Sequence, residues 1–315
     1  MINTRSNTTH AELLARLGSH VQENVPMSSY TTARVGGKAR YLLVIRTSEE
    51  LAEAVSILWE LETPFLVLGS GANVLFSDRG YNGVILLNRA HTIKVDAGSI
   101  PPTIWAESGT NLGTVARRAA QRGLSGLEWA AGIPGTIGGA VYGNAGAHGS
   151  DMSTNLVVAE ILHPNQGKVS LTSGQMGYGY RTSKLKNATA KAIILAVRLK
   201  LENSTPEIVK ALMDNYSAQR KRTQPPGASM GSMFKNPPGD YAGRLIEAAG
   251  LKGTRSGGVV VSQVHANFFV NDTGATAMDY WKLIQQVRQK VSDQFGVRLE
   301  LEVELLGNWT EKLEG

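Results

Sequence analysis

The stretch that decides the fold is Gly132-Ile-Pro-Gly-Thr-Ile-Gly-Gly-Ala140, which continues to Gly143-Asn-Ala-Gly-Ala-His-Gly149. So many glycines among apolar residues indicate a main chain that lies directly against a large flat or phosphorylated ligand, because glycine has no Cβ to hold a ligand away. A buried crossing of two backbones would explain Gly138 and Gly139 but not the whole run. The stretch therefore favours a ligand-binding loop.

A membrane helix is the alternative for this region. From Trp129 to Ala147 the chain carries no charge, and its glycines include the small-xxx-small spacing of helices that pair in membranes. Its six glycines and Pro134, however, leave too few large apolar side chains to stabilise a membrane span. The polar N-terminus also lacks the apolar core of a signal peptide. We therefore expect a cytoplasmic protein that makes no use of a membrane.

A second glycine-rich turn, Leu68-Gly-Ser-Gly-Ala-Asn-Val-Leu-Phe-Ser-Asp78, follows a short apolar strand expected at residues 65–68. It is not a P-loop, because no Gly-Lys-Ser/Thr follows, and Val74 breaks the dinucleotide-binding G-x-G-x-x-G pattern. What remains is either a plain hairpin turn or a loop whose N–H groups converge on a phosphate. A shorter glycine-marked segment, Thr32-Ala-Arg-Val-Gly-Gly-Lys-Ala39, precedes it.

The composition is that of a globular chain. Its 315 residues predict two or three compact units, and 42% apolar with 18% charged residues exclude a disordered chain. The absence of cysteine excludes a disulfide framework, thiolate metal ligands and a catalytic thiol. The six histidines show no metal-ligand spacing, so no metal is expected. A net charge of +6 fits an anionic partner, whether nucleotide or nucleic acid, or a solvated basic surface.

Local patterns predict a mixture of helices and strands. A capping box, Thr47-Ser-Glu-Glu50, opens one helix, and Asn111 caps another that Gly123 ends. Strands are expected at 83–87 and to dominate from 156 to 201. Residues 298–305 alternate as a strand does, with four apolar residues on one face and four charged residues on the other: Leu299, Leu301, Val303 and Leu305 against Arg298, Glu300, Glu302 and Glu304.

The clearest candidate for a domain boundary lies at residues 202–206. Thr205 can cap a helix and Pro206 suits its first position, so a helix is expected to run to residue 218. A helix at 240–249, short strands at 259–261 and 267–270, and a long helix at 277–295 are expected to follow. The pattern indicates an α+β protein with a separate C-terminal domain.

Together these segments resemble the UDP-N-acetylenolpyruvoylglucosamine reductase family, in its shorter type II form. The matching pieces occur in the family's order from about residue 30 to 307. They are Gly69-Ser-Gly-Ala-Asn-Val, Gly132-Ile-Pro-Gly, Asn144-Ala-Gly-Ala, Tyr180-Arg-Thr-Ser183, Gly231-Ser-Met-Phe-Lys-Asn-Pro237, Ala248-Ala-Gly-Leu251, Ser262-Gln-Val-His-Ala-Asn267 and Leu299-Glu-Leu-Glu-Val303.

The resemblance implies an α+β fold with a two-part FAD-binding unit of the vanillyl-alcohol-oxidase (PCMH) type and a C-terminal α/β substrate-binding domain. Residues 1–65 would form the first part of the FAD-binding unit, 66–203 the second part and 204–315 the substrate domain. The implied cofactors are FAD and NADPH, and the implied cofactor contacts are Gly69, Ser70, Gly71, Ala72, Asn73, Val74, Gly132, Ile133, Pro134, Gly135, Thr136, Gly138, Gly139, Asn144 and Gly146.

The implied activity is reduction of UDP-N-acetylenolpyruvoylglucosamine to UDP-N-acetylmuramate in peptidoglycan synthesis. Arg181 would stabilise the enolate that forms at the substrate carboxylate, and Ser232 would supply a proton to the carbanion. Glu302 would assist only in its protonated or firmly hydrogen-bonded form, so we expect a raised pKa there. The implied substrate contacts are Tyr180, Lys235, Asn236, Arg244 and His265.

The residues alone leave other roles open. Without the resemblance, Arg181 reads as an ordinary surface arginine, Ser232 as a turn cap and Glu302 as a solvated carboxylate. The chain departs from the family's pattern at His148, where an aromatic hydroxyl is expected, and at Thr223, where a lysine is common. If that lysine binds the diphosphate, Arg220 or Arg222 would take over its role.

Two other functions stay open for the sequence. One is a flavin oxidoreductase of the same fold that acts on a small hydroxy acid, and the other is a basic nucleotide- or nucleic-acid-binding protein. The segment from Gly231 to Asn236 and the strand of Glu302 favour the reductase, because the first alternative has no need of them. We expect a monomer that binds no nucleic acid.

Overall fold

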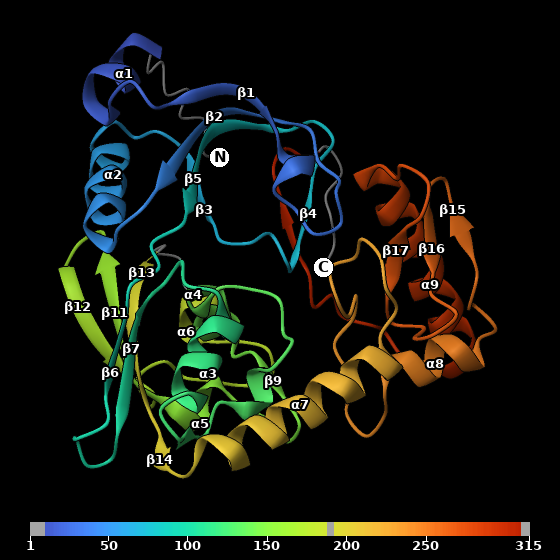
Figure 1. Cartoon of the computed structure of the whole chain (residues 1–315). Helices are drawn as coiled ribbons and strands as arrows, with labels where there is room; N and C mark the ends of the chain where they lie inside the picture. The colour runs from blue at the N-terminus through green and yellow to red at the C-terminus, as the bar shows by residue number, and fades with distance from the viewer. Residues whose placement is uncertain (1–9, 188–191, 310–315) are drawn as a thin grey trace. The chain divides into compact units, whose positions relative to one another are not determined.

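The computed structural model describes residues 10–187 and 192–309 (Figure 1). Within this part the chain forms two compact units. Unit 1 takes the residues up to 22 together with 41–69 and 83–218, and unit 2 takes 23–40, 70–82 and the residues from 219 onward. Strands β2 (Lys38–Ile45) and β5 (Tyr81–Asn88) and helix α7 (Pro206–Thr223) continue from one unit into the other. The expected divisions at residues 65 and 203 stay predictions.

The helices of unit 1 begin where the sequence provides caps. Thr47 accepts a hydrogen bond from the Glu50 N–H at 3.1 Å, and Asn111 accepts one from the Thr114 N–H at 3.0 Å, as predicted. The Glu50 carboxylate, however, accepts from the Arg46 N–H, so the expected reciprocal bond of a capping box at Thr47 is wrong. Besides α7, these helices are α1 (His10–Leu17), α2 (Ser48–Glu60), α3 (Leu112–Ala120), α4 (Ile137–Gly143), α5 (Met152–Asn155) and α6 (Lys184–Asn187).

A five-stranded antiparallel sheet forms the framework of unit 1. Its order is β12-β11-β13-β7-β6, with strands β12 (Gly167–Thr172), β11 (Leu156–His163), β13 (Ile193–Lys200), β7 (Thr103–Glu107) and β6 (Ile93–Asp96). A four-stranded sheet has the order β1-β2-β5-β3, in which β1 (Gln22–Pro26) is an edge and β3 (Phe65–Leu68) runs parallel to β5. Two-stranded ribbons pair β10 (Ser150–Asp151) with β9 (Gly146–Ala147) and β14 (Glu202–Asn203) with β8 (Leu124–Ser125).

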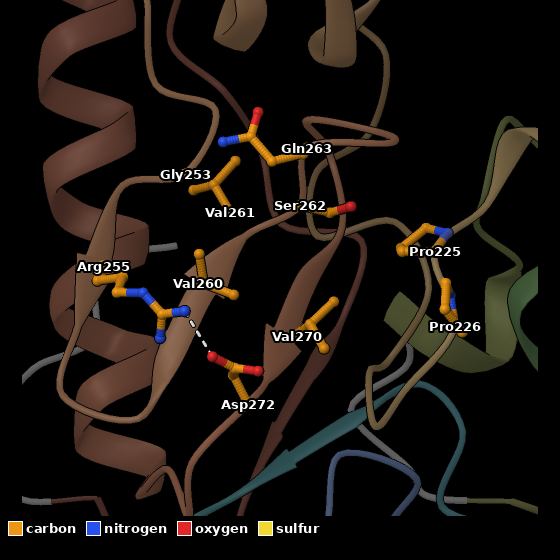
Figure 2. Close-up of a pocket in the computed structure, with 10 residues that line it drawn as sticks. All are labelled: Pro225, Pro226, Gly253, Arg255, Val260, Val261, Ser262, Gln263, Val270 and Asp272. Atoms are coloured by element: carbon orange, nitrogen blue, oxygen red, sulfur yellow. Dashed lines mark hydrogen bonds and ion pairs between the residues drawn. The ribbon is translucent and has the colours of Figure 1, made fainter.

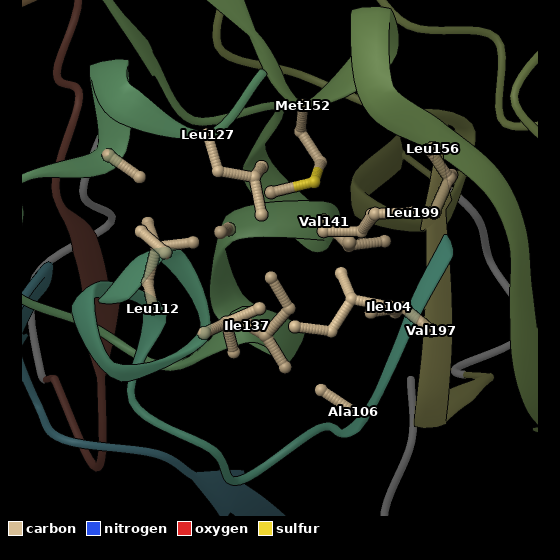
Figure 3. Close-up of a cluster of buried hydrophobic side chains, with 14 of the residues drawn as sticks. Ile104, Ala106, Leu112, Leu127, Ile137, Val141, Met152, Leu156, Val197 and Leu199 are labelled. Carbon is tan, nitrogen blue, oxygen red and sulfur yellow. The ribbon is translucent and has the colours of Figure 1, made fainter. Parts of the chain in front are cut away.

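An apolar core fixes α3 and α4 against the five-stranded sheet. Figure 3 shows Val197 and Leu199 of β13 near Ile137 and Val141 of α4, with Leu112 of α3 beside them. Each of these side chains is at most 1% exposed, and burial of an aliphatic side chain contributes about 1.5–3 kcal/mol. The glycine-rich segment immediately before α4 is therefore held on a rigid base.

Unit 2 is built on a small antiparallel sheet. Strands β15 (Arg255–Ser256), β16 (Val259–Val261) and β17 (Phe269–Asn271) follow in that order, with helices α8 (Ala242–Ala248) and α9 (Ala277–Phe295) packed with them in one core. Thr276 and Asp279 form a capping box at the start of α9, and Gly296 ends it with φ 67°. A parallel pair, β4 (Val74–Phe76) with β18 (Glu304–Leu306), completes the unit.

The final strand differs from its expected extent. Hydrogen-bonded strand covers only Glu304–Leu306, whereas Leu301 makes a single bridge to Phe234. The segment pairs with Phe234 at Leu301 but with β4 from Glu304 onward, and this change of partner interrupts the hydrogen-bonded ladder. The predicted alternation of burial holds in part: Leu299 and Val303 are buried and Arg298 and Glu300 are exposed. Leu301 and Leu305, however, are half-buried like Glu302 and Glu304, so the alternation does not extend over the whole segment. Among the described residues, no helix has both the length and the apolar character needed to cross a bilayer.

We predict that Leu199→Ala lowers the free energy of unfolding by about 2–5 kcal/mol, because it leaves a cavity in a packed core. Ile208→Ala is the matched control: Ile208 lies in the same unit and is 64% exposed, so its loss should cost about 0.5 kcal/mol or less. Urea unfolding followed by circular dichroism measures both. Equal losses for the two variants would show that the core assignment is wrong.

Candidate functional site

Two of the predicted loops meet in unit 1. A Cβ at Gly69, the residue after β3, would lie 2.5 Å from Oγ1 and 3.3 Å from Cβ of Thr136, in the glycine-rich segment. Thr136 is the N-cap of α4 and its Oγ1 accepts from the Gly139 N–H at 3.4 Å, so it has little freedom to move. Arg89 donates from Nη1 to the Gly69 carbonyl at 2.8 Å. The end of β3 is therefore packed directly against the residue that caps α4.

Backbone bonds attach the glycine-rich segment to residues 108–112. The N–H groups of Ile137 and Gly138 donate to the carbonyls of Thr110 and Ser108, both at 2.8 Å. A Cβ at Gly138 would lie 2.8 Å from Cβ of Ser108, which makes this glycine a true backbone crossing. Gly139 differs from that expectation, because it is exposed and the nearest atom to a Cβ there is 3.6 Å away. Gly139 is free to face a ligand.

Two buried hydroxyl groups at these loops have no hydrogen-bond partner among the described residues. They are Oγ of Ser70, which follows Gly69, and Oγ1 of Thr110, which is 1% exposed. A buried polar group without a partner costs about 1–3 kcal/mol. In addition, none of the N–H groups of Ser70 to Asn73 donates to a carbonyl in the part of the chain that the structure describes. Both features suit a polar ligand.

Arg181 lies at the tip of a tight turn in unit 1. Gly179 and Thr182 form the bridge that closes the turn, and Arg181 adopts a φ of 57°. Its guanidinium carbon lies 5.3 Å from the centroid of the Tyr180 ring, within cation–π range, and Tyr180 is 53% exposed. The predicted site residue Asn144 directs its side-chain amide to the base of this turn, at Gly179.

In unit 2, the segments of Ser232 and Glu302 are joined by a backbone hydrogen bond at Met233, the residue that follows Ser232. The Glu302 N–H donates to the Met233 carbonyl at 2.9 Å, and the Met233 N–H donates to the Asn267 carbonyl at 2.8 Å. Nδ2 of Asn73, from the second glycine-rich loop, donates to the Glu302 carbonyl at 3.0 Å. A predicted cofactor residue thus contacts the segment that carries Glu302. Arg181 belongs to unit 1.

The remaining predicted substrate contacts lie near this segment or on α8. The Lys235 ammonium pairs with the Glu300 carboxylate at 3.2 Å, and Oδ1 of Asn236 accepts from the Ala242 N–H at 3.1 Å at the start of α8. Arg244 forms an exposed bidentate pair with Asp240, and its hydrogen bonds are the main cause that lowers the pKa of Asp240 to about 2. The pair therefore extends the range in which Asp240 is ionised to lower pH.

His265 is packed rather than solvated. Its ring centroid lies 4.9 Å from that of Phe268, and its Cε1 would lie 3.0 Å from a Cβ at Gly243. Burial is the main cause that lowers the pKa of His265, so the ring is neutral near pH 7. A neutral imidazole suits a hydrogen-bonding role. In the described parts of the chain, no group of three or more His, Asp or Glu side chains is placed to hold a metal ion.

The positions that depart from the resemblance have their own partners. In unit 1, His148 stacks on Tyr216 of α7, with ring centroids 3.9 Å apart and planes 9° from parallel. Thr223 donates from its hydroxyl to the Gln219 carbonyl within α7 at 2.9 Å. Burial lowers the pKa of the Arg220 guanidinium. That Arg220 or Arg222 replaces the missing lysine stays a prediction.

A cavity of about 340 Å³ lies in unit 2, on one side of β16 and β17 (Figure 2). Figure 2 shows Pro225 and Pro226 facing these strands across it, and an ion pair of 2.5 Å between Arg255 and Asp272 at its edge. None of the predicted site residues lines it. Its walls are Pro225, Pro226, Gly253, Arg255, Val260, Val261, Ser262, Gln263, Val270 and Asp272.

Comparisons with known proteins match most of the chain to one family of enzymes. Residues 39–173 match the family model of an FAD binding domain, and residues 222–306 match that of the UDP-N-acetylenolpyruvoylglucosamine reductase C-terminal domain. The UDP-N-acetylenolpyruvoylglucosamine reductase of Chloroflexus aggregans is 42% identical over 91% of this chain and 97% of its own length. That of Bacillus velezensis is 40% identical over 94% of this chain and 97% of its own.

The chain belongs to the UDP-N-acetylenolpyruvoylglucosamine reductase family. A crystal structure of the family member from Thermus caldophilus superimposes with a TM-score of 0.76 at 37% identity, covering 89% of this chain and 97% of that one. The expected α+β fold with an FAD-binding domain and a distinct C-terminal domain is confirmed. That the FAD-binding domain is of the vanillyl-alcohol-oxidase type stays a prediction. The protein is an FAD-dependent reductase.

The residues around the two loops fit FAD. In unit 1, FAD would offer a polar partner to the buried Thr110 hydroxyl, and the exposed main chain at Gly139 suits close approach of a ligand. In unit 2, the buried Ser70 hydroxyl and the N–H groups from Ser70 to Asn73 suit phosphate oxygens. The individual cofactor contacts, including Gly146 and the run from Gly132 to Pro134, stay predictions.

Sequence reasoning missed Thr110, Ser183 and Asn267 as residues that shape the site. Asn267 is 2% exposed, and its side chain bonds both the N–H and the carbonyl of Phe234, which fixes the segment of Ser232. Only its place in the family's Ser262 to Asn267 motif could have suggested it. No local pattern marks Thr110.

We predict that Gly69→Ala weakens FAD binding about 5- to 150-fold, since overpacking costs about 1–3 kcal/mol and 1.4 kcal/mol is tenfold in affinity. The new methyl group would meet Thr136, a stiff β-branched side chain that is itself a helix cap. The control is Gly174→Ala, where no atom lies within 4 Å of the added Cβ. Fluorescence titration of the apoprotein with FAD measures both, and an unchanged dissociation constant for Gly69→Ala would refute the contact.

Proposed function

We propose that the protein reduces UDP-N-acetylenolpyruvoylglucosamine to UDP-N-acetylmuramate in peptidoglycan synthesis, with NADPH as the hydride donor. FAD, when bound, passes the hydride from NADPH to the methylene carbon of the enolpyruvyl group. The observation that carries the proposal is the hydrogen bonding of the Glu302 backbone to Met233, the neighbour of Ser232, and to Asn73 in one unit. It occurs in a chain whose relatives of this name align over nine-tenths of its length. We propose that it acts in the cytoplasm as a monomer.

The role proposed for Arg181 follows from where charge develops. Addition of a hydride to the methylene carbon leaves negative charge on the adjacent carbon, which spreads into the substrate carboxylate as an enolate. A guanidinium beside that carboxylate stabilises the charge as it grows, by roughly 3–4 kcal/mol on the scale of other oxyanion donors. Arginine suits the task because it keeps its proton at any relevant pH and its planar fork matches a carboxylate.

Ser232 is proposed as the group that protonates the carbanion. Hydrogen bonds to Asn267 and Glu302 hold its segment on both sides, so the backbone that carries the hydroxyl group is fixed in position. Glu302 is proposed to assist from its neighbouring place as a neutral acid, because an ionised carboxylate there would repel the enolate. That its pKa is raised stays a prediction.

Binding of the nucleotide sugar is proposed to use Tyr180, Lys235, Asn236, Arg244 and His265. Lys235 and Arg244 carry the positive charge that a diphosphate needs, but each is paired with a carboxylate. Solvent screens ion pairs at the surface, so a diphosphate can exchange with the Asp240 and Glu300 partners at little cost.

The wild-type protein tests the proposal directly. Under anaerobic conditions, NADPH is expected to bleach the flavin absorbance, and UDP-N-acetylenolpyruvoylglucosamine is expected to restore it with formation of UDP-N-acetylmuramate. Recovery of colour with a small 2-keto acid, and none with the nucleotide, would point to the alternative flavin oxidoreductase.

We predict that Ser232→Ala slows the recovery of flavin absorbance with the enolpyruvyl nucleotide by about 10²-fold or more, the usual value of a positioned proton donor. Bleaching by NADPH should change little, because that step needs no proton from Ser232. Stopped-flow absorbance separates the two half-reactions. An equal loss in both would contradict the proton-donor role.

We predict that Arg181→Lys slows the same second half-reaction about tenfold or more, although the charge is kept, because the planar fork is lost. The measurement is single-turnover kinetics with saturating nucleotide. Wild-type rates in this variant would refute the proposed contact between Arg181 and the carboxylate.

A further inference from the structure

We propose that Asn144 and Ser183 are positioning residues that hold the turn of Arg181 on the C-terminal end of α4, and so fix the guanidinium relative to the cofactor loop that starts the same helix. The inference rests on the proposed function, since it assigns these residues a task for Arg181. Neither side chain is required to touch the substrate or the cofactor.

The turn of Arg181 has an unfavourable backbone conformation. Gly179 and Thr182 exchange hydrogen bonds of 3.2 and 3.3 Å, which leaves Tyr180 and Arg181 as the two central residues. Arg181 has a φ of 57° at the second central position, where a type II turn normally carries glycine. A side chain with a Cβ is strained in this region, so the conformation persists only where its surroundings enforce it.

The first anchor of the turn is Asn144, the residue that ends α4. It is 4% exposed, and its Nδ2 donates to the Gly179 carbonyl at 3.0 Å and to the Asp151 carboxylate at 3.1 Å. Its Oδ1 accepts from the Ser153 N–H at 3.0 Å. Because both amide hydrogens and the amide oxygen are bound, the side chain has one orientation and fixes the position of Gly179.

The second anchor is Ser183, on the other side of the turn. Its side chain is fully buried, and its Oγ donates to the Tyr142 carbonyl in the last turn of α4 at 2.6 Å. Both legs of the turn, at Gly179 and at Ser183, are therefore tied to the same three residues, 142–144. One end of α4 holds the arginine turn.

The other end of α4 carries the glycine-rich segment. Seven residues separate Thr136 from Asn144, and a helix of this length spans about 10 Å. The core beneath α4 includes Ile137 and Val141, so the helix acts as a rigid spacer between the segment and Arg181. This arrangement supplies what catalysis needs, since a shift of about 1 Å in a positioning group can cost about 10²-fold in rate.

The test is a double-mutant cycle between each anchor and Arg181. Asn144→Ala and Ser183→Ala are expected to slow recovery of flavin absorbance with the enolpyruvyl nucleotide by about 10- to 100-fold. For Ser183→Ala, whose residue is not among the predicted cofactor contacts, bleaching by NADPH is expected to stay within about twofold of wild type. In the Arg181→Lys background, either substitution is expected to add less than about twofold, because the anchors act through the arginine. Ser183→Ala removes one hydroxyl only and serves if Asn144→Ala does not fold.

Asn155→Ala is the matched control. Asn155 is a buried asparagine of the same unit, 5% exposed, whose side chain makes two hydrogen bonds of 3.2 Å, with Trp129 and with the Lys200 carbonyl. It should lower the melting temperature as Asn144→Ala does, yet leave both half-reactions within about twofold of wild type.

Two failures are distinguishable. If the wild-type flavin does not recover its colour with the nucleotide, the proposed function is wrong. If the wild type recovers it, but the anchor variants slow the reaction as much in the Arg181→Lys background as alone, the losses are independent and the positioning role is overturned. Equal slowing by Asn155→Ala would overturn it as well.

Discussion

The close approach of Gly69 to Thr136 is the constraint on which the cofactor site depends. With 2.5 Å between a built Cβ and Oγ1, only a residue without a side chain lets the end of β3 reach the cap of α4. This contact brings together two segments that are 67 residues apart in the sequence. Next to Gly69 lies the buried hydroxyl of Ser70, and the buried hydroxyl of Thr110 belongs to the residues that bond the glycine-rich segment.

Backbone contacts also shape the region around Ser232 in the second unit. There the backbone of Met233 accepts from Glu302 and donates to Asn267, so main-chain bonds help to place two residues with proposed chemical roles. Side chains are then available for the substrate. In both units, buried asparagines do the work of orientation: Asn144 at the arginine turn and Asn267 at the serine segment each bond a neighbouring backbone on more than one side.

Local structure could be predicted from the sequence where local chemistry decides it. Helix α9 has the expected bounds because Thr276, Asp279 and Gly296 determine its ends within a few residues. The final strand was overestimated, because its ladder depends on partners that lie far away in the sequence. Likewise Asn144 reaches Gly179 across 35 residues and Asn73 reaches Glu302 across 229. Such bonds leave no periodic or spacing signal, and only the resemblance points to the residues proposed as catalytic.

The most direct test of the account is a crystal structure of the protein with FAD and UDP-N-acetylenolpyruvoylglucosamine. The account predicts that the isoalloxazine ring lies over the enolpyruvyl group, with the substrate carboxylate on the Arg181 guanidinium and the Ser232 hydroxyl directed at the carbon that receives the proton. A ring bound away from Arg181, Ser232 and Glu302, or a diphosphate that makes no contact with the main chain around Gly69 and Thr136, would contradict it.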